Sequence, residues 1–304
     1  MGLFQKKVPL EKEWEKLMKE ERKFLVSRAE KKDTFINQKL AQLVPDKLQE
    51  TLDAAFAKAF GLIFEKGTSV IEKTYNKDEL EKNFQINQFT ADIKKDGKSI
   101  KKFSKNAKQS GNVNLLVSGA AGIGMGVLGV GIPDIPVFLA MVLKSVYEIA
   151  LHYGYRYDTP EEQYFILLLI ETAVSHGRDL IERNQEVDDY IKTEKMPDPY
   201  NRDVQIKLTS AMLSKELLYM KFLQGVPVVG AVGGAYDVIY MKQITEYANL
   251  KYKRRFLRAR RGGKSVTAGP GLEPDVKNES EFVVAVPVVA ETETEINGSV
   301  KETE

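Results

Sequence analysis

The apolar residues of this chain recur at helical spacing, and no strand-like alternation stands out. Residues 10–32 place Trp14, Leu17 and Phe24 among dense charge, which predicts an amphipathic surface helix. Pro45 ends that pattern and Asp46 can cap a new helix. One face of this second helix is formed by Leu48, Leu52, Ala55, Phe56 and Phe60.

Capping signals place the later helices. Thr159, Pro160 and Glu162 match the N-cap, N1 and N3 positions of a capping box, and one helix kinked at Gly177 is expected to follow. A further helix is expected over about 202–224, and the last should end at Gly262–Gly263. Residues 66–90 are mixed and polar, and predict short helical pieces. The fold class expected is all-α: a multi-helix bundle with a Gly-rich apolar central helical hairpin and a disordered C-terminal tail.

The centre of the chain is an uncharged stretch, residues 109–133, which ends at Asp134. Residues 113–133 are long enough to span a bilayer core, and 135–151 could return as a second arm. Glycine in a helix interior costs about 1 kcal/mol relative to alanine, so close helix contact must offset it. Small residues spaced four apart predict such packing at Ser118, Gly122 and Gly126, and again at Gly230 and Gly234.

Three arrangements of this stretch stay open: shallow insertion into a membrane, a span, or a soluble core with tight helix crossings. The segments around Asp134 and Asp237 resemble each other approximately, because each aspartate follows a Gly-rich apolar run. Asp134 fits an N-cap, or an ionisable group at membrane depth.

Charge divides the chain. Residues 263–304 hold nine acidic residues and three lysines, a net charge of −6, so the remainder carries about +8. We therefore expect N-terminal charged helices (1–45), a helical domain (46–262) and an acidic tail (263–304). A basic body suggests an anionic partner.

Two basic segments are candidates for binding lipid headgroups. Residues 94–108 carry seven lysines, including Lys101 and Lys102, and read as a solvated helix face or a basic membrane anchor. The run at 251–261 carries Arg254, Arg255 and Arg258. A nucleic-acid partner is not favoured, because no recognised binding module accompanies this run.

Little in the sequence supports catalysis. The chain has no cysteine, and its GxGxxG match at 124–129 lies in an apolar helical context, unlike a dinucleotide site. An acid–base or metal-dependent hydrolase would have to use Glu148, His152, Glu171 and His176, which can equally be structural. We expect no cofactor and no metal.

Residues 119–173, GAAGIGMGVLGVGIPDIPVFLAMVLKSVYEIALHYGYRYDTPEEQYFILLLIETA, and the later VPVVGAVGGAYDVIY resemble the bacterial EcsC family over roughly residues 50–260. The N-terminal helices and the tail lie outside this resemblance. It implies a helical protein with no established activity, and it supplies no catalytic residues.

The leading hypothesis is a non-enzymatic cytoplasmic protein, peripheral to or partly inserted in the membrane. It would engage anionic lipid or a membrane protein through the Gly-rich segment and the basic patches. The alternatives are the hydrolase and a soluble helical scaffold that binds a protein partner.

Overall fold

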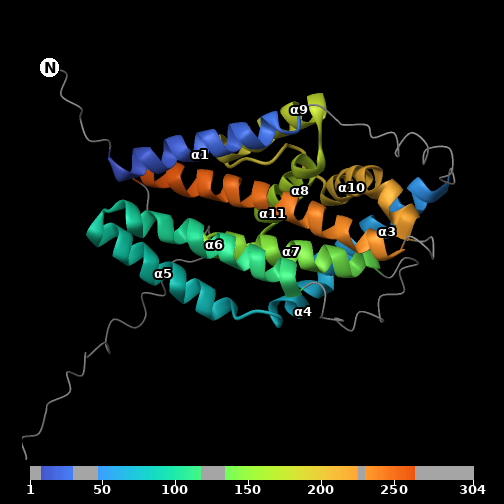
Figure 1. The fold of residues 1–304 in the computed structure, drawn as a ribbon, viewed down its shortest axis with the longest axis horizontal. Coiled ribbons are helices and arrows are strands. Elements are labelled where there is room, and N and C mark those ends of the chain that lie inside the picture. Colours follow the sequence, from blue (N-terminus) through green and yellow to red (C-terminus); the bar gives the residue numbers. More distant parts are fainter. Residues whose placement is uncertain (1–7, 30–46, 118–133, 225–229, 264–304) are drawn as a thin grey trace, which may run out of the picture. The chain divides into compact units, whose positions relative to one another are not determined.

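The computed structural model describes residues 8–29, 47–117, 134–224 and 230–263, which belong to one compact unit. These residues form helices joined by turns and contain no strand, which confirms the all-α class (Figure 1). The elements are α1 (Pro9–Val26), α3 (Lys47–Leu62), the π-helical turn η1 (Ile63–Gly67), α4 (Thr68–Glu72), α5 (Lys77–Lys94), α6 (Gly97–Val117), α7 (Asp134–His152), α8 (Pro160–Val174), α9 (Gly177–Thr193), α10 (Arg202–Gln224) and α11 (Gly230–Arg261).

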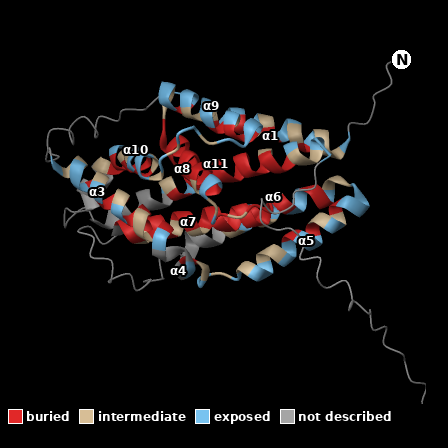
Figure 2. Cartoon of the chain, turned by 180° about the vertical axis from the view of Figure 1, so that it is seen from behind, coloured by how far each residue is buried: buried red, intermediate tan, exposed pale blue. Residues whose placement is uncertain are grey.

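Helix α11 is the centre of this unit. It packs against α1, α6, α7, α8 and α10. Figure 2 shows the consequence, because buried residues concentrate on α7, α8 and α11 while the outer faces of α5 and α9 are exposed.

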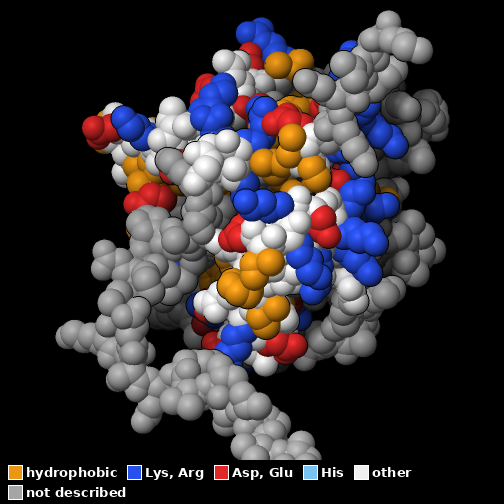
Figure 3. Space-filling model, turned by 90° about the vertical axis from the view of Figure 1, so that its left-hand side faces the viewer, with side chains coloured by type: hydrophobic (Ala, Val, Ile, Leu, Met, Phe, Trp, Pro, Cys, Tyr) orange, Lys and Arg blue, Asp and Glu red, His pale blue; other side chains and the backbone are white. Residues whose placement is uncertain are grey.

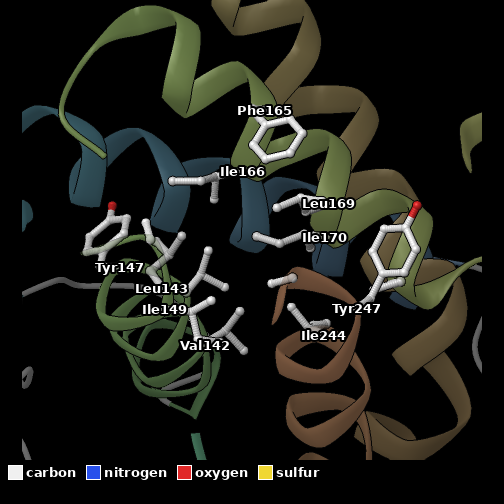
Figure 4. Close-up of a cluster of buried hydrophobic side chains, with 14 of the residues drawn as sticks. Val142, Leu143, Tyr147, Ile149, Phe165, Ile166, Leu169, Ile170, Ile244 and Tyr247 are labelled. Atoms are coloured by element: carbon white, nitrogen blue, oxygen red, sulfur yellow. The ribbon is translucent and has the colours of Figure 1, made fainter. Parts of the chain in front are cut away.

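The core lies between α7, α8 and α11. Figure 4 shows Leu143 and Ile149 of α7, Ile166 and Leu169 of α8, and Ile244 of α11 pointing into one apolar cluster. Among the described residues, one segment, Ile135–His152, is long and apolar enough to cross a membrane. Since 83% of this segment is buried within the protein, it serves here as a core helix.

The helix start at Thr159 was predicted correctly, but the length of the helix that follows it was not. The Thr159 side chain accepts a hydrogen bond from the Glu162 backbone N–H at 3.2 Å and starts α8. The expected single kinked helix is instead two helices, because α8 ends at Val174 and α9 begins at Gly177, whose φ is +57°. The expected short pieces in 66–90 include the 18-residue helix α5.

Much of the Gly-rich stretch lies outside the described residues. Ser118, Gly122 and Gly126 are among the residues not described, so the predicted packing of these three positions stays a prediction. Gly230 and Gly234 lie in the first turns of α11, and Asp237 follows on the same helix. Asp134 is the first residue of α7, within one residue of the expected helix start.

Candidate functional site

The first half of the basic run at the end of α11, residues 251–255, faces inward rather than outward. Lys251 has no exposed surface and Arg255 is 8% exposed. Burying a charge is costly unless a partner compensates it. Acidic residues of α1, α8 and α9 supply the compensation, and we call the resulting contacts the α11 ion-pair row: Lys251–Asp188, Lys253–Glu13, Arg254–Glu21, Arg254–Asp188 and Arg255–Glu162.

Arg255 is the most enclosed guanidinium of this row. Its Nη1 donates to both carboxylate oxygens of Glu162, at 2.7 and 2.9 Å. Its Cζ lies 4.1 Å from the ring centroid of Tyr155 and 4.5 Å from that of Phe165. These contacts hold the guanidinium rigidly inside the bundle.

Arg254 and Arg255, which the sequence suggests as headgroup ligands, are thus paired with carboxylates of other helices. Arg254 Nη1 lies 2.7 Å from Glu21 Oε2 and 3.1 Å from Asp188, so it joins α1 to α9 and α11. Arg258 differs from both, because its side chain is exposed and forms no ion pair with a described residue.

The lysines of α6 do lie at the surface. Lys98, Lys101, Lys102, Lys105 and Lys108 are exposed, and helical spacing places them within one face. The opposite face buries Ile100, Phe103 and Ala107. Lys101 lies 3.8 Å from Glu13, and Lys108 lies 4.0 Å from Glu20. Both contacts are long and both lysine side chains are more than half exposed, so these lysines stay available to an external anion.

An apolar stripe lies on α5, the helix that precedes α6 and packs against it. Ile86, Phe89 and Ile93 are 60%, 69% and 64% exposed, and their spacing places them along one face. We call these three residues the α5 stripe. Sequence reasoning missed it because residues 66–90 look polar on average, although the i, i+3, i+7 spacing was a detectable signal.

The four candidate catalytic residues have structural partners. Glu148 and His152 are both buried on α7. The His152 Nε2 lies 2.7 Å from Ser110 Oγ, and burial lowers the pKa of His152 to about 4. The imidazole is therefore neutral near pH 7 and hydrogen-bonds α7 to α6.

Glu171 and His176 lie at the α8–α9 break. Glu171 accepts hydrogen bonds from Gln205 and Thr209 of α10, at 2.6 and 2.5 Å, while His176 Nδ1 lies 3.6 Å from Glu216. No group of three or more His, Asp or Glu among the described residues is placed to hold a metal ion. The geometry thus joins His152, Glu171 and His176 to neighbouring helices, pairs Glu148 with Lys144 of its own helix, and does not gather the four into a metal site.

Comparison with protein-family models matches residues 11–257 to the EcsC protein family. No curated protein and no solved structure matches the chain. The match begins inside α1, so the expectation that the N-terminal charged helices lie outside the family region is wrong for α1. Because the match covers most of the chain, the protein belongs to the EcsC family.

Proposed function

We propose that this EcsC-family protein is a peripheral membrane protein that binds anionic lipid surfaces through α5 and the start of α6. The observation that carries the proposal is the exposed α5 stripe on a helix that packs against the lysine-bearing α6. Apolar side chains that can enter the acyl boundary, flanked by cations that contact headgroups, are the features of an interfacial helix.

The two helices meet at one end of the unit. The end of α5 leads directly into the start of α6, and the helices pack together. Figure 1 places this junction at the same end of the unit as the start of α1 and the end of α11. Figure 3 views that end and shows hydrophobic side chains exposed among Lys and Arg side chains.

The magnitudes are sufficient for reversible binding. Each lysine near an anionic leaflet contributes about 1 kcal/mol. Burying one large apolar side chain contributes about 2 kcal/mol more. Five exposed lysines on α6 and three apolar residues on α5 therefore favour an anionic bilayer over a neutral one.

Co-sedimentation with vesicles tests the proposal. We expect the protein to pellet with equimolar phosphatidylcholine and phosphatidylglycerol, and to stay in solution with phosphatidylcholine alone. The double variant Phe89→Gln/Ile93→Gln should weaken binding at least about tenfold, which corresponds to 1.4 kcal/mol. Both side chains are exposed, so folding should be unaffected.

The matched control changes two exposed apolar residues elsewhere. Val204 and Leu208 of α10 are 52% and 44% exposed, and Val204→Gln/Leu208→Gln should leave vesicle binding unchanged. Equal binding to neutral and anionic vesicles, or equal loss in both double variants, would overturn the proposal.

A further inference from the structure

A cavity of about 430 Å³ opens where α11 ends between α1 and α9. Cavities of this size accommodate small molecules. We call it the end pocket; its lining is Trp14, Ile191, Lys192, Glu194, Arg255, Arg258, Ala259, Arg261 and Gly262. Four of these residues are basic and one is acidic. Arg255, Arg261 and Lys192 are paired with carboxylates, so among the described residues Arg258 supplies the uncompensated charge that favours an anion.

Arg255, which lines this pocket, carries an unused donor. Its hydrogen bonds to Glu162 come from Nη1, while its Nε–H is buried and has no hydrogen-bond partner among the described residues. A buried unsatisfied donor of a charged group costs about 1–3 kcal/mol or more. An anion that reaches this Nε–H from the pocket would supply the missing acceptor.

Two further arginines follow Arg255 along the same side of α11. Arg258 and Arg261 come three and six residues later, so the three guanidinium groups can approach one ligand. Arg258 is exposed and forms no ion pair with the part of the chain that the structure describes. Arg261 pairs with Glu11 at 2.8 Å and its Cζ lies 4.5 Å over the Trp14 ring.

The negative end of the α11 dipole explains only part of this arrangement. Cations in a last helical turn are stabilised by the unpaired carbonyls, and Arg258 and Arg261 lie in that turn. Arg255 lies deeper, where Glu162 already balances its charge. The unsatisfied Nε of Arg255 therefore needs another account.

We propose that the end pocket binds a phosphate monoester, with Arg255 and Arg258 donating to the phosphate oxygens and Trp14 contacting the organic part. Guanidinium groups bind phosphate in a bidentate manner that lysines do not match. The ester is either a soluble metabolite or the headgroup of a lipid with a terminal phosphate. The proposal stands independently of vesicle binding through the α5 stripe, although Arg260 of α11 pairs with Asp92 of α5 near the pocket.

Calorimetric titration of the full chain with glycerol 3-phosphate tests the site. Wild type should bind it, and Arg258→Gln should weaken binding at least about tenfold because the exposed guanidinium is lost without disturbing the core. Arg178→Gln is the matched control. This arginine is 89% exposed at the other end of α9, and its loss removes the same charge. Absence of binding by wild type, or equal weakening by both variants, would overturn the proposal.

Vesicles then distinguish the two sources of phosphate. If the ligand is a lipid, wild type should prefer phosphatidic acid over phosphatidylglycerol, and Arg258→Gln should abolish that preference while keeping the binding that depends on the α5 stripe. If the ligand is soluble, glycerol 3-phosphate should bind with no such preference. Both results support the site, and Phe89→Gln/Ile93→Gln should leave glycerol 3-phosphate binding intact in either case.

Discussion

Glu171 is a carboxyl group with no exposed surface, held on α8 by Gln205 and Thr209. Burial raises its pKa from 4.5 to about 7, although the hydrogen bond from Thr209 and the nearby Arg183 act in the opposite direction. Its second oxygen, Oε2, has no hydrogen-bond partner among the described residues. The fold therefore disfavours the ionised form of Glu171.

Glu171→Gln should stabilise the protein at alkaline pH. The pKa of Glu171 is higher in the folded state than in the unfolded state, so the folded protein holds this proton to a higher pH. The free energy of unfolding that the wild type loses because of this difference grows as pH rises from 4.5 to about 7. At pH 8 the variant should gain up to about 3 kcal/mol in free energy of unfolding, and near pH 4 nothing. Urea unfolding measures this. The exposed Glu50 of α3 is the control, and a flat difference across pH would contradict the assignment.

Gly154 follows α7 with a φ of +82°, and a Cβ there would overlap the Phe84 ring of α5. Gly154→Ala should therefore lower the free energy of unfolding by about 2 kcal/mol or more, through backbone strain and overpacking. Gly61→Ala should instead raise the free energy of unfolding. Nothing lies within 4 Å of its Cβ position on α3, so alanine should stabilise that helix by roughly 0.5–1 kcal/mol. Thermal unfolding of both variants measures the two signs, and a stable Gly154→Ala would show that Phe84 can move aside.

At the scale of elements, residues close in sequence determine where a helix starts. Which face of a helix is buried depends on ion pairs with residues far away in the sequence. The Thr159 cap could be read from neighbouring residues because its donor lies three residues away. The partners of the α11 cations lie much further off, Asp188 63 residues from Lys251 and Glu13 240 residues from Lys253. Periodicity within α11 therefore showed a basic run and could not show that acids on other helices bury it.

The α11 ion-pair row should behave as buried pairing, not as surface charge. Glu162→Gln leaves Arg255 buried without a counter-charge and should cost about 3 kcal/mol, because removing one partner of a buried pair is strongly destabilising. The double variant Glu162→Gln/Arg255→Gln should cost less than the sum of its single changes. Urea unfolding of the cycle measures the coupling. The exposed Arg178–Glu182 pair is the control, with an expected coupling below about 1 kcal/mol, and equal couplings would contradict the burial argument.

At the scale of the whole molecule, composition suggested a boundary at residue 45 that the packing of α1 does not respect. Leu17 and Phe24 of α1 are buried, and the Phe24 ring centroid lies 5.1 Å from that of Tyr247 on α11. Glu13 and Glu21 neutralise cations of α11. Helix α1 looks like a charged surface helix in sequence because these acids, which resemble solvated residues, are in fact its contact face.

Deleting residues 1–29 should consequently unfold more than one helix. The truncated chain would expose the apolar face that Leu17 and Phe24 cover, and would leave Lys251 with Asp188 alone and Lys253 without its carboxylate. Uncompensated buried charge and lost apolar burial add, so cooperative thermal unfolding should disappear and a hydrophobic dye should bind. Deleting 270–304, a separate unit, is the matched truncation and should leave the melting temperature unchanged. If both truncations melt like the full chain, α1 is an appendage and the family fold begins at α3.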